Sequence, residues 1–486
     1  MISTRLGSGA IKTVQDVYEG VDVYGRGSHG GGGFGSYRAI EHIDPVSLGL
    51  SVALFAPGWT WESNQGNDGF SWSSWWEIER RLWIGPRENV TVPPMPQPRD
   101  PDDPHGPFRP FSDFFAWQMP PDPSTLPFCT TFSPGVGFAW FVNGTAVMPR
   151  TVDGWTDIDK QSALGDKLWP QPQVQWEDRE GIKEPVPNAS STLHFDDAWL
   201  GGNGLRVTFN AMGSQAEDAV FRSVWLPIQS LNITPHVRYT ARVIFKALDA
   251  AEPPEPPLVD TDVGLTVKYP GSTLEVIDIP NAEELTGGWT RQTMTFMLSE
   301  NQDLKEDAPI TAGLVVGFTT EDPSKAVQFS ILLGQLAVYL ASPTLSTNLS
   351  LASPRILWAD FRPSQDHNSG ILTWELGSVY PPIMLPDTAP PVDSPIPLWS
   401  LDNSKHPFPL CAYFNIYAST SLGDPTQATF IGTTGLHGRA NRFYVDWGVL
   451  PDVIKSLKEI RFFVQGVTDR GEVIEWEQCV FVDVSR

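Results

Sequence analysis

The chain has 486 residues, and its 57 acidic and 33 basic residues give a formal net charge of -24. This length exceeds that of a single core, so we expect several domains. The acidic charge argues against nucleic acid and anionic membranes as partners, because both would be repelled. No apolar run approaches the ~20 residues of a membrane helix, and the three cysteines are too far apart in the sequence to indicate a zinc site or disulfide framework. No metal or other cofactor is expected.

Two features bear on where the protein resides and what it contacts. The first residues lack the basic and apolar regions of a signal peptide, so we expect the cytosol. Five Asn-x-Ser/Thr sequons keep secretion as the alternative: Asn89, Asn143, Asn188, Asn232 and Asn348. The 19 Trp and 26 Phe residues are suited to stacking on sugars as well as to filling cores, and core packing is the commoner use.

The first part of the chain alternates strand and helix signals. Residues 13–24 predict a strand, residues 25–35 a glycine loop, and residues 36–43 a short helix that ends before a proline. Residues 48–56 predict a second strand, whose uniformly apolar sequence is typical of a parallel strand covered on both faces.

Residues 72–84 predict an amphipathic helix with four of the tryptophans on or beside its apolar arc. Glu79 is a charged residue inside that apolar arc, and an ion pair with a basic side chain is the one explanation that the pattern offers for its position. The resulting order, β-α-β-α, is part of an α/β fold. Residues 86–127 are rich in proline and predict a wrapped connector rather than a helix or a central strand.

The rest of the chain predicts two antiparallel β-sandwiches. The first comprises residues 127–345 and the second residues 346–486, after an α/β part with its connector over residues 1–126. The expected strands of the first are 205–211, 239–248, 263–269, 291–298, 312–320 and 327–340, and those of the second are 371–376, 413–419, 441–447, 459–471 and 479–484.

Two glycine motifs suggest other chemistry. Gly25-x-Gly27-x-x-Gly30 follows a strand, and Asp44 lies about 20 residues on, as in a dinucleotide-binding fingerprint. The helix begins only after further glycines, however, and Asp44 precedes the next strand instead of ending it. The context therefore does not fit the fingerprint, and a nucleotide-dependent oxidoreductase is the least favoured of the three hypotheses for this chain. His29-Gly-Gly-Gly is similar to an esterase oxyanion loop, but the sequence has no Gly-x-Ser-x-Gly elbow.

Charged and aromatic residues concentrate where the two predicted strands end. In parallel α/β folds the carboxyl ends of the strands form the ligand-binding face. The candidate site residues are Asp22, Tyr24, Arg26, Trp59, Trp61 and Glu62. A structural role is an equal alternative, in which Asp22 and Arg26 pair with each other and the tryptophans cover the rim.

Four long motifs resemble glycoside hydrolase family 85, the endo-β-N-acetylglucosaminidases that act on N-glycans. They are residues 17–34 (VYEGVDVYGRGSHGGGGF), 50–62 (LSVALFAPGWTWE), 127–147 (PFCTTFSPGVGFAWFVNGTAV) and 154–170 (GWTDIDKQSALGDKLWP). The resemblance implies that the two predicted strands are the last two of a (β/α)8 barrel. It also implies a carbohydrate-binding-module-like first sandwich and is consistent with a fibronectin type III-like second one.

The resemblance implies a mannosyl-glycoprotein endo-β-N-acetylglucosaminidase that hydrolyses the β-1,4 bond between the two core N-acetylglucosamines. The family mechanism is retaining and substrate-assisted: the substrate's acetamide attacks, a glutamate serves as acid and base, and an asparagine two residues earlier orients the acetamide. Trp59 would stack on sugar and Glu62 would accept hydrogen bonds from hydroxyls, while Asp22, Tyr24 and Arg26 would line the neighbouring rim. N-glycans or free oligosaccharides are the implied partners.

The sequence departs from the family at the catalytic pair. Asn281-Ala-Glu283 has the right spacing but lies in a predicted loop of the first sandwich, so we reject it. We therefore expect this chain to be the C-terminal part of such an enzyme, inactive by itself, with the catalytic strand upstream. The alternative is a carbohydrate-binding protein without catalysis.

Overall fold

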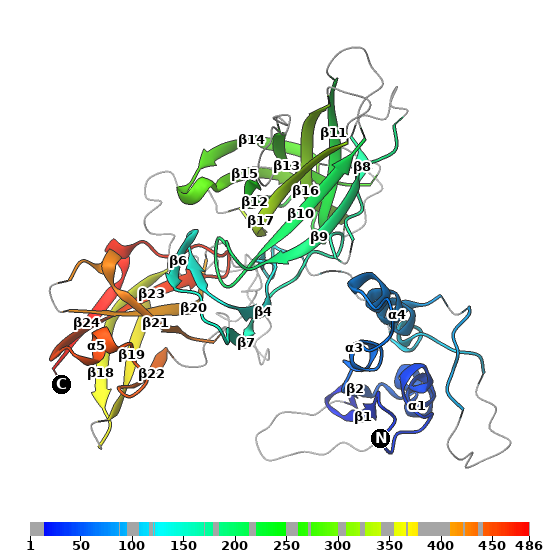
Figure 1. The fold of residues 1–486 in the computed structure, drawn as a ribbon, viewed down its shortest axis with the longest axis horizontal. Helices are drawn as coiled ribbons and strands as arrows, with labels where there is room; N and C mark the ends of the chain where they lie inside the picture. The colour runs from blue at the N-terminus through cyan, green and yellow to red at the C-terminus, as the bar shows by residue number, and fades with distance from the viewer. Residues whose placement is uncertain are drawn as a thin grey trace, which may run out of the picture. The chain divides into compact units, whose positions relative to one another are not determined.

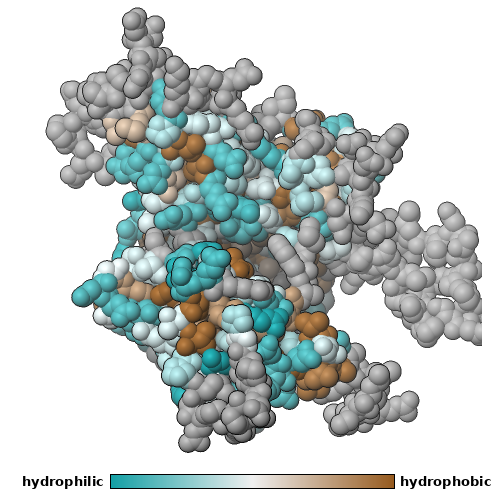
Figure 2. Space-filling view, turned by 90° about the vertical axis from the view of Figure 1, so that its right-hand side faces the viewer, coloured by the Kyte–Doolittle hydropathy of each residue, from teal (hydrophilic) through white to brown (hydrophobic). Residues whose placement is uncertain are grey.

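A computed structural model describes residues 14–86, 88–94, 106–115, 120, 122–169, 171–177, 184–212, 220–248, 261–270, 274–299, 308–320, 326–341, 354–365, 368–377, 409–420, 423–435 and 441–485. The chain forms two compact units, Met1–Met119 and Pro120–Arg486 (Figure 1). None of the described helices is long and apolar enough to cross a membrane. On the face shown in Figure 2, apolar residues form separate small areas among hydrophilic ones.

The first unit contains a two-stranded parallel sheet, β1 and β2, in which Asp22 lies opposite Phe55. The order β-α-β-α is the expected one, and α4 covers the residues predicted for the amphipathic helix. The elements are η1 (Val14–Asp16), β1 (Tyr18–Asp22), η2 (Gly33–Gly35), α1 (Tyr37–Ile43), α2 (Pro45–Leu48), β2 (Ser51–Phe55), α3 (Trp59–Glu62), α4 (Trp72–Ile84) and η3 (Phe111–Phe114).

Two expectations for this unit need correction. Strand β2 is not covered on both faces within the described residues, since Ala53 and Phe55 are exposed. The proline-rich segment is more than a connector, because Phe108, Phe111 and Phe114 are buried in the core of the unit. Phe111 and Phe114 are three residues apart on the 3-10 helix η3, a spacing that places both rings on one side.

The second unit begins with two sheets that pack around one core. The larger sheet has the order β14-β15-β12-β17-β10-β9, with β3 also paired to β17, and the smaller one has the order β13-β16-β11-β8. The core takes Val207 and Phe209 from the larger sheet and Leu226 and Val316 from the smaller. The strands are β3 (Phe128–Thr130), β8 (Gln175–Trp176), β9 (Asn188–His194), β10 (Gly204–Ala211), β11 (Val220–Ile233), β12 (Arg238–Leu248), β13 (Thr261–Lys268), β14 (Glu275–Glu284), β15 (Thr290–Met297), β16 (Ala308–Thr320) and β17 (Val327–Leu340).

A second pair of sheets follows, with the orders β18-β19-β22 and β21-β20-β23-β24. Trp374, Phe414, Trp447 and Phe462 are buried between them. The strands are β18 (Arg355–Pro363), β19 (Ser369–Gly377), β20 (Cys411–Ser419), β21 (Thr429–Thr433), β22 (Arg442–Asp446), β23 (Glu459–Thr468) and β24 (Val480–Ser485), with the short helices η7 (Pro425–Gln427), α5 (Asp452–Lys455) and η8 (Trp476–Gln478).

Two short ladders, β4-β7 and β5-β6, precede these sheets in the chain. Their strands are β4 (Pro134–Gly137), β5 (Trp140–Val142), β6 (Thr145–Met148) and β7 (Trp155–Gln161), and η4 (Thr286–Gly288) follows β14. One further expectation is wrong: Asn281 and Glu283 lie on strand β14, at the edge of the larger sheet, and not in a loop.

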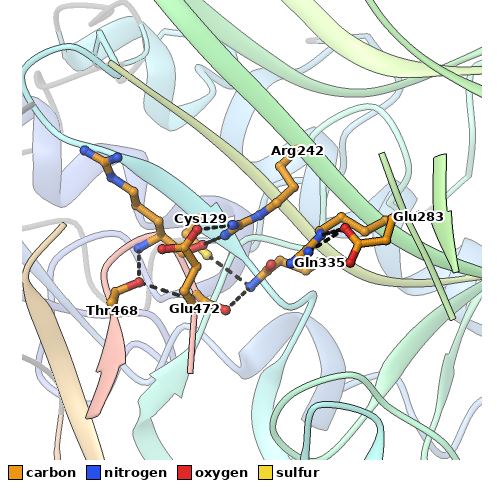
Figure 3. Close-up of polar contacts among 9 residues, drawn as sticks. Cys129, Arg242, Glu283, Gln335, Thr468 and Glu472 are labelled. Atoms are coloured by element: carbon orange, nitrogen blue, oxygen red, sulfur yellow. Dashed lines mark hydrogen bonds and ion pairs between the residues drawn. The ribbon is translucent and has the colours of Figure 1, made fainter. Parts of the chain in front are cut away.

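Within the second unit, the turn after β23 packs against the larger sheet (Figure 3). Arg242 of β12 forms an ion pair with Glu472 and donates to the carbonyl oxygen of Arg470. The side-chain Nε2 of Gln335, on β17, donates to the carbonyl oxygen of Gly471 over 3.0 Å. Since Arg242 and Gln335 are both buried, this contact has little access to solvent.

An apolar cluster continues the contact between the two pairs of sheets. Trp140 of β5 stacks on Phe430 of β21, with ring centroids 6.0 Å apart and planes at 12°. Lys160 of β7 donates to the carbonyl oxygen of Thr434 and lies 4.5 Å from the centroid of the Tyr413 ring. The two pairs of sheets are therefore joined by an apolar cluster and a buried polar contact.

Candidate functional site

The candidate site begins where the two parallel strands of the first unit end. Strand β1 ends at Asp22 and β2 at Phe55, so both carboxyl ends lie at the same edge. The backbone N–H of Val23 donates to the carbonyl oxygen of Phe55 over 3.0 Å, which continues the pairing beyond the strands. After β2, the aromatic residues that follow the strand form a single helical turn, α3 (Trp59–Glu62).

Four candidate residues form one hydrogen-bonded network at this edge. Asp22 accepts from Nε of Arg26 over 2.8 Å and from the backbone N–H of Tyr24 over 2.9 Å. The hydroxyl of Tyr24 donates to Glu62, which is 38 residues away in the chain. The hydrogen bond from Arg26 holds the pKa of Asp22 below its ordinary value, and the bond to Glu62 raises the pKa of Tyr24.

Arg26 also lies against aromatic rings. Its guanidinium carbon is 5.1 Å from the centroid of the Tyr24 ring and 5.5 Å from that of Phe55. The pairing of Asp22 with Arg26, expected under a structural role, is thus present. It is joined to a second carboxylate from another element, Glu62, so that one partly exposed and one exposed acceptor lie at one strand edge.

Trp59 packs against the glycine loop. Its ring is 5.7 Å from that of Phe34 in an edge-to-face arrangement. Gly33 has a φ of +53°, and a Cβ at this position would lie 2.5 Å from the Trp59 ring. A side chain at residue 33 would therefore displace Trp59. Close packing within the first unit accounts for this glycine without a nucleotide.

Trp61, like Trp59, takes part in none of the hydrogen bonds described for that network. Its ring contacts Phe70 and Trp75 at centroid distances of 4.9 and 5.9 Å. Its indole N–H donates to Oε1 of Gln65 over 3.2 Å. Through Trp75, the ring of Trp61 helps to pack α3 against α4.

Sequence reasoning did not single out Thr60 as functional, and it left Glu79 with only an ion pair as explanation. Thr60 is buried between the candidate residues of α3. Glu79 accepts hydrogen bonds from the hydroxyl of Thr60, over 2.5 Å, and from the indole N–H of Trp83, over 2.8 Å. In the sequence, the signal for this contact is the position of the Glu79 carboxylate on the otherwise apolar arc of α4.

The described residues contain no group of three or more His, Cys, Asp or Glu side chains placed to hold a metal ion. Two cavities of about 520 and 500 Å³ lie in the second unit, and none of the candidate residues lines them. Cys129 lines the larger cavity, and burial raises its pKa to about 12, so the thiol is protonated at neutral pH. Neither cavity adds a reactive group to the site.

The Asp22–Arg26 pair gives a pH-dependent prediction. Because the pKa of Asp22 is lowered in the folded state, its contribution to stability is present above the ordinary aspartate pKa and is lost as the pH falls through the lowered value. In Arg26→Gln, we expect the pKa of Asp22 to rise towards about 3.9. An NMR titration of the Asp22 carboxyl carbon measures this change. Arg362→Gln, which alters another exposed pair, should leave that titration unchanged.

Comparison with known proteins gives the chain a family context. Residues 3–140 match the family model described as glycosyl hydrolase family 85. The N-terminal segment is related to this family. The matched segment contains all six candidate residues and confirms the resemblance for the motifs at residues 17–34 and 50–62, whereas the motif at residues 154–170 lies outside it.

The matched relatives are endo-β-N-acetylglucosaminidases. The chain is 39% identical to cytosolic endo-beta-N-acetylglucosaminidase 1 of Arabidopsis thaliana over 69 residues. This aligned region makes up 14% of this chain and 10% of the relative. The chain is 26% identical to the cytosolic endo-beta-N-acetylglucosaminidase of Gallus gallus over 218 residues. This aligned region makes up 44% of this chain and 22% of the relative. The matches thus span less than a quarter of the length of these curated relatives.

A solved structure was also found, that of the Endo-D glycoside hydrolase domain from Streptococcus pneumoniae R6. The similarity covers 98% of this chain and 58% of the streptococcal chain, at 14% sequence identity and a TM-score of 0.45. A TM-score at this level does not bear on the fold of the family 85 segment.

Proposed function

We propose that this chain provides a glycan-binding rim of a cytosolic endo-β-N-acetylglucosaminidase that acts on N-glycans or free oligosaccharides. The observation that carries the proposal is the network that joins Asp22, Tyr24 and Arg26 to Glu62 at the shared edge of two parallel strands. The same edge belongs to the segment related to family 85.

The residues at this edge suit a neutral, hydroxyl-rich ligand. Glu62 is exposed and Asp22 is partly exposed, so their carboxylates can accept hydrogen bonds from sugar hydroxyls. Trp59 is half-buried and supplies an aromatic surface for the apolar face of a sugar ring. Arg26 and Tyr24 hold the two carboxylates in place.

We propose the family chemistry for the whole enzyme: hydrolysis of the β-1,4 bond between the two core N-acetylglucosamines by a retaining, substrate-assisted mechanism. The six rim residues have binding roles in this scheme. Glu283 has no catalytic role in this scheme: it lies on the edge strand β14 of the second unit, and its exposed carboxylate forms an ion pair with Arg291 over 2.6 Å. We therefore expect no hydrolysis by these 486 residues alone.

We also propose how the chain divides into domains. We assign residues 1–126 to the last two β/α units of a (β/α)8 barrel with the connector, residues 127–345 to a carbohydrate-binding-module-like sandwich, and residues 346–486 to a fibronectin type III-like one. The parallel pairing of β1 with β2 supports the first assignment, since barrel strands are parallel neighbours.

Glycan binding tests the proposed rim. In Trp59→Ala we expect the affinity for a high-mannose N-glycan to fall about tenfold, because an aromatic contact of this kind contributes roughly 1–1.5 kcal/mol. Isothermal titration calorimetry of the full chain measures it. Trp358→Ala, which removes an exposed tryptophan from β18, is the matched control and should bind as the unaltered chain does. Equal binding by both variants would contradict the assigned role of Trp59.

Hydrolysis is tested separately by mass spectrometry of a high-mannose glycopeptide incubated with the chain. A product that retains a single N-acetylglucosamine would refute the expected inactivity. The same assay on the protein isolated from its source distinguishes the two functions: cleavage supports the enzyme, whereas glycan binding without cleavage supports a carbohydrate-binding protein without catalysis.

A further inference from the structure

Helix α3 carries three of the six candidate residues but is too short to be stable by itself. It consists of the four residues Trp59–Glu62. Isolated helices of this length do not persist in water, because nucleation fixes several residues for a single hydrogen bond. The position of Trp59 and Glu62 must therefore be set by contacts that α3 makes with other elements.

Thr60 makes the central contact of α3. Its side chain is buried, with 1% of its surface exposed. The indole N–H of Trp75, on α4, donates to the Thr60 hydroxyl oxygen over 3.2 Å, and Nδ2 of Asn64 donates to the Thr60 carbonyl oxygen over 3.0 Å. The hydroxyl proton of Thr60 is then available for one acceptor, which is Oε2 of Glu79 at 2.5 Å.

Both carboxylate oxygens of Glu79 accept a hydrogen bond. Oε2 accepts from Thr60, and Oε1 accepts from the indole N–H of Trp83 over 2.8 Å. Hydrogen bonds to a charged acceptor are stronger than those between neutral groups. Glu79 is one α4 turn from both Trp75 and Trp83, so the three residues present their polar atoms on one side of the helix.

We propose that Glu79 is a positioning residue of the glycan-binding rim: through Thr60 it fixes α3 on α4 and thereby sets Trp59 and Glu62 in the orientation that receives the sugar. Glu79 itself does not touch the glycan. This inference rests on the proposed function for its last step, whereas the fixing of α3 does not depend on it.

Glu77, on the same helix, provides a matched control. Its carboxylate binds Arg80 and Arg81 at 2.8 and 3.0 Å, and both partners belong to α4. Removal of either carboxylate takes one negative charge from α4. Of these two carboxylates, however, only that of Glu79 connects α4 to α3 through the described hydrogen bonds.

The first experiment measures hydrogen exchange of the backbone amides that close α3, those of Trp61, Glu62 and Ser63, in the full chain. These amides donate to carbonyl oxygens of Gly58 and Trp59. We expect exchange to be on the order of tenfold faster in Glu79→Ala and unchanged in Glu77→Ala. Unchanged exchange in Glu79→Ala would overturn the inference.

The second experiment measures the affinity for a high-mannose glycan. Glu79→Ala should bind about tenfold more weakly, and Glu79→Gln, which keeps one acceptor, should recover part of the loss. Thr60→Val removes the same hydrogen bond with little change in volume, so it should reproduce the effect, and the double variant should lose little more. Thr60→Val also serves if Glu79→Ala fails to fold.

The outcomes separate the inference from the proposed function. Faster exchange with undiminished glycan affinity would show that α3 does not present the sugar contact, which overturns the positioning role. If the unaltered chain binds no glycan, the proposed function fails, while the exchange rates still decide whether Glu79 fixes α3.

Discussion

Replacing Gly471 with alanine is expected to lower the free energy of unfolding of the second unit by roughly 2–5 kcal/mol, because strain and overlap add at this position. Gly471 has a φ of +73°, and an added Cβ would lie 2.8 Å from Cδ of Gln335 and 2.9 Å from Sγ of Cys129. Gln335 is fully buried and has little room to move away. Calorimetry of the full chain should show a lower melting temperature, or separate transitions for the two pairs of sheets.

Gly201→Ala is the matched control for this substitution. Gly201 has a φ of +93°, but a Cβ there would meet nothing within 4 Å. The control therefore isolates the backbone strain, which costs roughly 1–2 kcal/mol. If Gly471→Ala destabilises the unit no more than Gly201→Ala does, the close approach of residues 471 and 335 does not contribute to stability.

Trp140→Ala should destabilise the same unit by about 3–5 kcal/mol, the usual range for removing a buried tryptophan. Trp140 is 3% exposed and has ring contacts with Trp155, Tyr413 and Phe430. Tyr413 and Phe430 belong to the second pair of sheets, so the cavity would open where that pair meets the ladder of Trp140. Urea denaturation, monitored by near-ultraviolet circular dichroism, measures the change.

The control for this prediction is Trp358→Ala on β18. Trp358 is 57% exposed, and exposed substitutions usually change stability by about 0.5 kcal/mol or less. A loss of stability in Trp140→Ala as small as that of the control would mean that the apolar cluster does not hold the two pairs of sheets together.

Segments with a clear period were predictable from the sequence. Helix α4 and strand β17 occupy the residues expected for them, since their side-chain patterns alone favour a helix of 13 residues and a strand of 14. Strand β11 was not among the expected strands. It contains Pro227, which weakens a strand signal, and the structure accommodates the proline next to a register shift between Pro227 and Gln229.

The candidate site was only partly predictable. Its residues were found because charged and aromatic side chains follow two apolar strands, a pattern that depends on local sequence. The hydrogen bond between Tyr24 and Glu62 was not predictable, because 38 residues separate the two and their approach depends on the pairing of β1 with β2. The separation of Trp61 from the network likewise depends on the packing of α3 against α4.

The sequence by itself determined the helices and strands with the clearest patterns, where polar residues gather, and the resemblance to family 85, because these depend on neighbours along the chain. The tertiary structure alone decided that proline-rich residues bury Phe108 in a core, that Glu79 receives the hydroxyl of Thr60, and that Gln335 binds the turn at Gly471. Such contacts join residues far apart in sequence, and side-chain geometry selects them only after the chain has packed.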